Sequence, residues 1–236
     1  MASSLLTATL AWLSVGGFVA GALAMYYHER AGRLLTATTW GVFGIFWGTL
    51  VPQFWFVGSS FIEAALALVA VPLCFYTGYL LLDGRDSLFV ISRAVAVMGL
   101  VYLPATSIDA IYEPMIRTVT LQTQWAMNAL GYHPELVAND NGLQSVFLFV
   151  QPNGHRILTE IELACTGLGS MAIFAGLISA VDAPLDRKAK AFLVSIPVIW
   201  MLNLVRNVFI AVAFGEQWFQ VFVPQVLALF GQSDPY

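Results

Sequence analysis

Cys165 is the first residue whose type and setting could carry chemistry. It lies within Glu162–Ser170, where a polar, extended stretch gives way to an apolar one. We expect it at the start of a membrane helix, where free N–H groups and a partial positive charge favour a thiolate over a thiol. Gly167 and Gly169 would let a substrate backbone approach closely. The alternative interpretation is a small buried thiol, which is what most cysteines are.

Arg206 is the second such residue, and it interrupts an otherwise apolar segment between Asn203 and Asn207. An arginine within a membrane helix costs about 2.5 kcal/mol or more, so it usually faces a polar cavity or a partner. A guanidinium beside a thiol favours the thiolate and can stabilise an oxyanion, but it keeps its proton and cannot be a general base. His133 and His155 are candidates for that role, although a solvated turn histidine is the simpler interpretation of His155. The alternative for Arg206 is snorkelling to the outer headgroups.

The elements that must position these residues are membrane helices. The chain is 59% hydrophobic and 10% charged, whereas a soluble domain is about 25% charged. Apolar stretches recur at the length of about 20 residues that a bilayer requires. We therefore expect an all-α, polytopic membrane protein with about six or seven transmembrane helices and a small extracytoplasmic α+β insertion. The predicted spans are residues 5–27, 37–57, 61–82, 88–108, 164–181 and 191–214, with a shorter segment at 217–230.

Basic residues predict the orientation of these spans. They gather in three loops, at 28–33, 83–86 and 187–190, which fall on one side of the membrane. The positive-inside rule makes that side cytoplasmic and places the N-terminus and residues 109–163 outside. Arg206 follows Lys190 by sixteen residues, or about 24 Å of helix, which brings it into the outer leaflet near Cys165.

The outer segment predicts a helix and a β-hairpin. Residues 116–130 have helical character, residues 132–142 indicate loop or turns, and residues 145–150 and 155–163 flank a Pro-Asn-Gly turn. The organisation is then a four-helix membrane region, an extracytoplasmic segment and the helices that carry Cys165 and Arg206. The three regions cover residues 1–108, 109–163 and 164–236.

Other classes of function have little support. The low sequence pI of 5.2 gives no support for nucleic-acid binding. No phosphate-binding glycine loop, zinc-ligand pair or Cys-x-x-Cys motif occurs, so we expect no metal and no cofactor. One open alternative is a transporter or channel with an anion site at Arg206 and a structural Cys165, although paired inverted repeats are not apparent. The other is a non-catalytic membrane scaffold.

Two motifs resemble those of the exosortase/archaeosortase family. Ala164-Cys165-Thr166-Gly167, followed by residues 170–174, resembles the cysteine motif of the family, and residues 203–211 resemble its arginine motif. The resemblance implies that Cys165 is the nucleophile of a cysteine transpeptidase and that Arg206 is essential. Residues around them are then candidates for substrate binding or oxyanion support: Thr166, Gly167, Gly169, Ser170, Asn203 and Asn207.

The resemblance also implies a partner. Family members recognise a C-terminal signal made of a short motif, a membrane helix and a basic cluster. In the archaeal branch the motif is Pro-Gly-Phe, the S-layer glycoprotein is a leading substrate, and the mature protein is linked to a prenyl-based lipid. The family has a third essential basic residue on a later helix. The sequence ends at Tyr236 before such a helix, and we expect that this part is missing from it.

Overall fold

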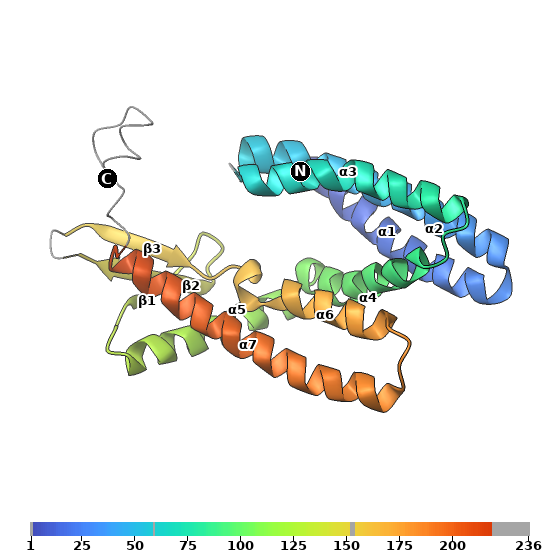
Figure 1. Cartoon of the computed structure of the whole chain (residues 1–236). Helices are drawn as coiled ribbons and strands as arrows, with labels where there is room; N and C mark the ends of the chain where they lie inside the picture. Colours follow the sequence, from blue (N-terminus) through green and yellow to red (C-terminus); the bar gives the residue numbers. More distant parts are fainter. Residues whose placement is uncertain (1, 59, 152–153, 219–236) are drawn as a thin grey trace. The chain divides into compact units, whose positions relative to one another are not determined.

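The structure is a computed structural model that describes residues 2–58, 60–151 and 154–218 (Figure 1). Its chain forms two compact units. The first contains residues 2–107 and 170–195, and the second contains residues 108–169 and the described residues from 196 onward. The predicted regions 1–108, 109–163 and 164–236 divide the chain by membrane topology, which is a different property, and they stay a prediction.

Five helices of the described chain are long and apolar enough to cross a membrane. Only 22–33% of each apolar window is buried, so most of these side chains face outward, as lipid-facing side chains do. The expected polytopic helical membrane protein is thereby confirmed. The five are α1 (Ala2–Tyr27), α2 (Glu29–Pro52) with the π-helical turn η1 (Gln53–Val57), α3 (Phe61–Leu82), α4 (Leu88–Ser107) and α7 (Leu185–Gly215).

The predicted span at 164–181 is shorter in the structure. Helix α6 (Leu168–Ala180) has 13 residues and a length of about 20 Å, less than the hydrocarbon thickness of about 30 Å. It begins late because η2 (Leu163–Thr166) forms a separate 3₁₀ turn before it. Of the predicted segment 217–230, only the first two residues lie within the described chain.

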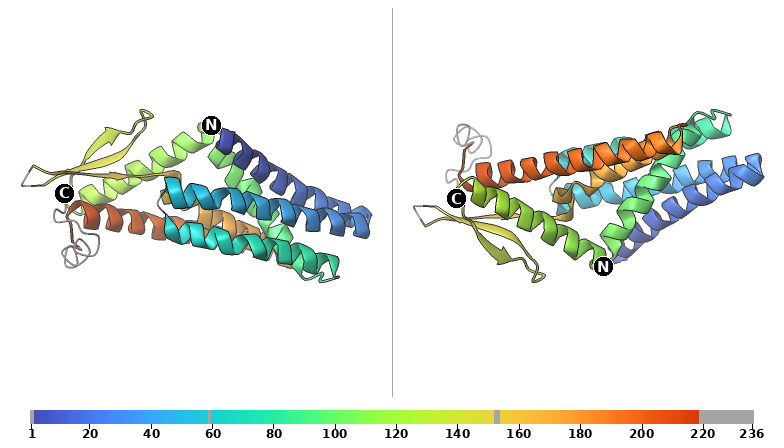
Figure 2. Two further views of the ribbon diagram at one scale, coloured as in Figure 1. Left: turned by 90° about the horizontal axis from the view of Figure 1, so that it is seen from above. Right: turned by 90° about the horizontal axis from the view of Figure 1, so that it is seen from below.

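Helices α1, α2 and α3 lie side by side in the first unit (Figure 2), and α4 packs against α1. The rings of Phe18 and Trp40 meet edge to face at 5.1 Å, and Trp40 Nε1 donates a hydrogen bond of 2.8 Å to Ser92 Oγ. A Cβ atom added to Gly176 would collide with the carbonyl oxygen of Ala94. Helix α6 therefore approaches α4 backbone to backbone, as small residues allow in membranes.

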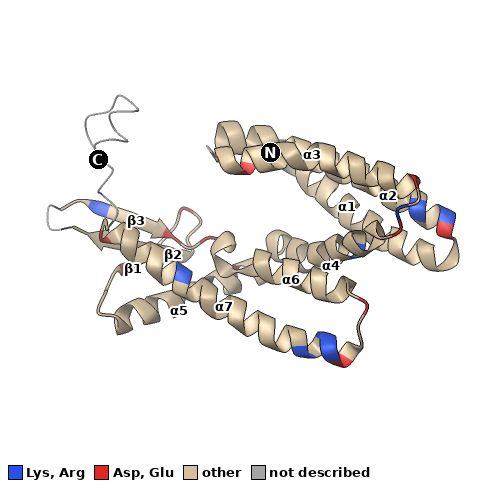
Figure 3. Cartoon of the chain, in the orientation of Figure 1, with Lys and Arg blue, Asp and Glu red and all other residues tan. Residues whose placement is uncertain are grey.

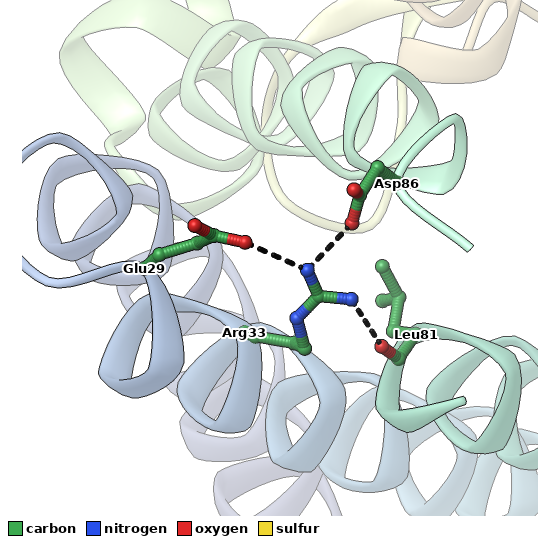
Figure 4. A network of polar contacts seen from close by, with 4 residues as sticks. All are labelled: Glu29, Arg33, Leu81 and Asp86. Atoms are coloured by element: carbon green, nitrogen blue, oxygen red, sulfur yellow. Dashed lines mark hydrogen bonds and ion pairs between the residues drawn. The ribbon is translucent and has the colours of Figure 1, made fainter. Parts of the chain in front are cut away.

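Charged residues gather at the end of this unit formed by the α1–α2 and α3–α4 connections (Figure 3). Arg33 Nη2 lies 3.0 Å from Glu29 Oε1 and 2.8 Å from Asp86 Oδ1, and Nη1 donates to the Leu81 carbonyl at 3.3 Å (Figure 4). The same guanidinium lies over the Phe89 ring at 5.8 Å. One arginine thus joins α2, the end of α3 and the start of α4.

The second unit contains a three-stranded antiparallel sheet in the order β1-β2-β3. The predicted hairpin is confirmed as β2 (Gln144–Val150) paired with β3 (Arg156–Glu160), with Phe147 opposite Thr159. The prediction of loop throughout 132–142 is wrong for β1 (Glu135–Ala138), which pairs with β2. Four residues are too few to show a strand periodicity, so their state depends on the neighbouring strand.

Helix α5 (Asp109–Ala129) begins before the predicted helix at 116–130. It holds α7 through Gln122, whose Oε1 accepts a hydrogen bond of 2.9 Å from Trp200 Nε1. Further along α7, the Gly215 carbonyl accepts a hydrogen bond from Gln151 Nε2 at the end of β2. The C-terminal half of α7 is therefore held by both the helix and the sheet of the second unit.

Candidate active site

Cys165 lies in the 3₁₀ turn η2 between β3 and α6. Its N–H donates a hydrogen bond of 2.9 Å to the Glu162 carbonyl, and its side chain is half-buried with a free thiol. An extended segment does lead into a helix here, as expected. The helix itself begins three residues later, at Leu168, so its free N–H groups follow Cys165 rather than include it.

Two residues fix the turn from within. Thr166 is buried, and its Oγ1 donates to the Leu163 carbonyl at 2.7 Å and accepts from the Leu168 N–H at 3.3 Å. Gly167 has φ of +76°, in the left-handed region that favours glycine. The Thr166 hydroxyl thus bonds to the turn on both sides, and the predicted role of Thr166 in substrate binding or oxyanion support stays a prediction.

Asn203 and Asn207 of α7 converge on the Cys165 backbone. Their Nδ2 atoms donate hydrogen bonds of 2.5 and 2.7 Å to the Cys165 carbonyl oxygen. Asn207 is buried, and a Cβ added to Gly167 would lie 3.1 Å from the Asn203 side chain. We predicted substrate binding or oxyanion support for both asparagines. In the structure each directs an amide N–H to the cysteine backbone, so they act first by holding the turn against α7.

Arg206 lies on the helical turn that these asparagines define. Residues three and four apart on a helix are neighbours, so Arg206 leaves α7 beside Asn203 and at the level of the Cys165 carbonyl. Its side chain is exposed, and no hydrogen bond or ion pair joins it to the described residues. The structure thus brings Cys165 and the Arg206 turn together within one unit.

The two remaining candidates differ in their surroundings. A Cβ added to Gly169 would meet nothing within 4 Å, so space for a substrate backbone exists at this position. Ser170 is exposed in the first turn of α6, at the point where the chain passes from one unit to the other.

The histidines lie away from the cysteine. His133 contacts Asn128 Oδ1 at 3.2 Å, at the end of α5. The His155 carbonyl accepts from the Gln151 N–H at the far end of β3, six residues before Ile161. At about 3.3 Å per residue this is roughly 20 Å, which excludes direct proton transfer between His155 and Cys165.

A polar pocket of about 410 Å³ adjoins the segment before Cys165, and the sequence did not suggest it. Its wall combines Tyr112 of α5, the loop 139–141, Glu160 and residues 162–164. Asn139 Nδ2 donates to Glu160 Oε1 at 2.8 Å, which joins the loop to β3. The one signal was the run of polar residues at 139–141, which we interpreted as a turn.

Comparison with known proteins identifies the class. A profile of the transmembrane exosortase family matches residues 8–231. The chain therefore belongs to the transmembrane exosortase family, and it is a multi-pass membrane protein. It is 47% identical to archaeosortase A of Haloferax volcanii over 242 residues, 98% of this chain and 80% of that protein. It is 42% identical to archaeosortase A of Natronomonas pharaonis over 235 residues, 97% of this chain and 74% of that protein. No solved structure matches the chain.

Proposed function

We propose that this protein is a membrane-embedded cysteine transpeptidase that cleaves C-terminal sorting signals. The observation that carries the proposal is the pair of hydrogen bonds from Asn203 and Asn207 to the Cys165 carbonyl, which bring a free thiol to the helical turn that carries Arg206. Membership of the exosortase family supports a peptidase or transpeptidase activity. The substrate class we propose is a surface protein, such as an S-layer glycoprotein, with a Pro-Gly-Phe signal.

In the proposed reaction, the Cys165 thiolate attacks the carbonyl carbon of the scissile peptide bond. The C–N bond then breaks, a thioester forms, and the amine of the C-terminal helix leaves after taking up a proton. Arg206 stabilises the negative charge on the carbonyl oxygen while keeping its own proton. A hydroxyl group of a membrane lipid, or water, attacks the thioester and restores the thiol.

The surroundings of Cys165 suit this substrate. A C-terminal signal helix would lie in the bilayer, with the signal motif at the outer interface. The polar pocket lined by Glu160 and residues 162–164 would take the polar chain that precedes the scissile bond, and the open space at Gly169 would admit the peptide backbone. The extracytoplasmic position of the site is part of the proposal and rests on the positive-inside rule.

The second cysteine offers a matched control. Cys74 is buried in the core of the first unit, whereas Cys165 is half-buried, so Cys74→Ala removes a thiol without touching the site. We expect Cys165→Ala to abolish cleavage of a signal-bearing substrate and Cys74→Ala to retain it. Mass spectrometry should find a hydroxylamine-sensitive acyl group on Cys165 alone. Normal processing by Cys165→Ala would refute the proposal, and anion transport without cleavage would support the transporter.

A further inference from the structure

We propose that a groove in the first unit binds an anionic membrane lipid, with its phosphate on Arg93 and a hydrocarbon chain along α1. The groove has a volume of about 370 Å³ and lies among α1, α2 and α4. Phe18, Ala22, Met25 and Phe89 supply apolar wall, and Arg93 supplies the cation. The ligand that matches such a wall is amphipathic, with an apolar chain and a negative headgroup.

The groove lies at the end of the unit where the α1–α2 and α3–α4 connections meet. Met25 is in the last turn of α1, and Phe89 is in the first turn of α4. Arg93 is five residues past the start of α4, or about 7.5 Å, which is within snorkelling reach of the headgroups. By the positive-inside rule this end faces the cytoplasm, where leaflets carry anionic lipids that attract basic residues.

The polar side chains on the groove wall differ in whether they have hydrogen-bond or ion-pair partners within the described protein. Thr36 Oγ1 donates to the Gly32 carbonyl at 2.8 Å. Ser92 Oγ donates to the Leu88 carbonyl at 3.0 Å and accepts from Trp40. Arg93 is exposed, and within the described part of the chain its guanidinium has no ion pair or hydrogen bond. The guanidinium is thus a full charge that still requires an anion in a membrane setting.

Arg33, at the same end of the first unit, has protein partners for its guanidinium. It has two carboxylates and a carbonyl oxygen as partners, all from the protein (Figure 4). Arg93 has no such partner, although both arginines lie near the Phe89 ring that lines the groove. A lipid phosphate would fill the role that Glu29 and Asp86 fill for Arg33, because a guanidinium binds phosphate through two parallel hydrogen bonds.

The lipid is favoured over a protein occupant by charge. A passing apolar helix would cover the wall but leave the Arg93 cation without an anion. A lipid satisfies both parts at once, since its chain covers apolar surface at about 25 cal/mol per Å² while its phosphate pairs with the guanidinium.

Photo-crosslinking in nanodiscs tests the proposal. Two preparations contain equal parts phosphatidylglycerol and phosphatidylcholine, and in each a different lipid carries a diazirine on its acyl chain. Peptide mapping should place the phosphatidylglycerol label on the segments containing Met25 and Phe89. A basic residue near an anionic lipid contributes about 1 kcal/mol, so we expect about fivefold more label from phosphatidylglycerol.

Three variants sharpen the result. Arg93→Gln should reduce the phosphatidylglycerol label to the phosphatidylcholine level, whereas Arg93→Lys should keep much of it. Arg85→Gln removes an exposed loop arginine from the same end and should change nothing. Circular dichroism and size-exclusion profiles check that each variant is folded. Equal labelling by both lipids, unchanged labelling of Arg93→Gln, or protein–protein crosslinks at Met25 in place of lipid would overturn the proposal.

Discussion

The buried Asn207 side chain donates a hydrogen bond of 2.7 Å to the backbone carbonyl of Cys165. Asn207 is the residue directly after Arg206, so the same turn of α7 that carries the guanidinium also holds the segment that carries the thiol. The side-chain amides of Asn207 and Asn203 thereby hold together two segments whose functional residues are 41 positions apart in the sequence.

Replacing Asn207 by Ala should slow catalysis more than it weakens substrate binding. The Cys165 carbonyl would keep only the Asn203 donor, and a lost hydrogen bond of about 1.4 kcal/mol corresponds to about tenfold in rate. We expect a tenfold lower kcat with KM changed less than about twofold, together with a changed rate of thiol labelling at Cys165. Asn128→Ala, at the end of α5, is the control. Unchanged kcat and labelling in Asn207→Ala would exclude a positioning role.

Arg206→Lys should lose at least about 100-fold in kcat, the cost of removing an oxyanion donor. Lysine keeps the positive charge but not the planar fork of donors, so it does not replace the guanidinium geometry. Cleavage assays in reconstituted vesicles measure the effect. Arg156→Lys makes the same exchange at an exposed position on β3 and should be neutral. Should Arg206→Lys retain full activity, snorkelling to the headgroups would be the better account of Arg206.

Gly167→Ala and Gly169→Ala should differ although they lie two residues apart. An alanine at 167 would have to adopt φ of +76° and place its Cβ 3.1 Å from Asn203, which should cost about 2 kcal/mol. An alanine at 169 meets open space in a helix and should change stability by less than about 1 kcal/mol. Thermal unfolding in detergent gives both values. If a substrate backbone passes Gly169, this variant should be stable yet raise KM.

His155→Ala should leave activity within about twofold of the parent, because roughly 20 Å of β-strand separates this residue from Cys165. The measurement is the pH dependence of kcat/KM, which should keep its shape. Loss of one limb of that profile in His155→Ala would show that the histidine reaches the site by a rearrangement of the hairpin.

Properties that depend on local sequence were predictable. Runs of about 20 apolar residues identify spans because the bilayer sets their length, and α1 to α4 lie where these runs predict. The β2–β3 hairpin followed from alternation around a Pro-Asn-Gly turn. Strand β1 could not be predicted in this way, because four residues show no periodicity and their extended conformation depends on pairing with β2. Helix α6 proved too short to span because Thr166 and Gly167 form a turn that hydropathy cannot detect.

In the site, the sequence indicated which residues to consider but not how they bond. The chemistry proposed for Cys165 and Arg206 follows from residue type, and the prediction that they lie at a common level followed from counting 1.5 Å per helical residue. That the asparagine amides bind the Cys165 backbone could not be predicted, since an amide suits substrate, oxyanion and carbonyl equally. The pocket lined by 139–141, Glu160 and 162–164 was missed because it requires the folded loop to meet β3.

The hydrogen bonds along α7 also determine which face of this helix contacts the rest of the second unit. Trp200, Asn203 and Asn207 each bond to a different part of the second unit, and because successive helical residues turn by about 100°, these three share one stripe. A single residue inserted between Trp200 and Asn203 would rotate the asparagines, and Arg206 with them, by that angle relative to Gln122. The number of residues from Trp200 to Asn207 therefore fixes the direction in which Arg206 leaves α7 relative to the Cys165 carbonyl.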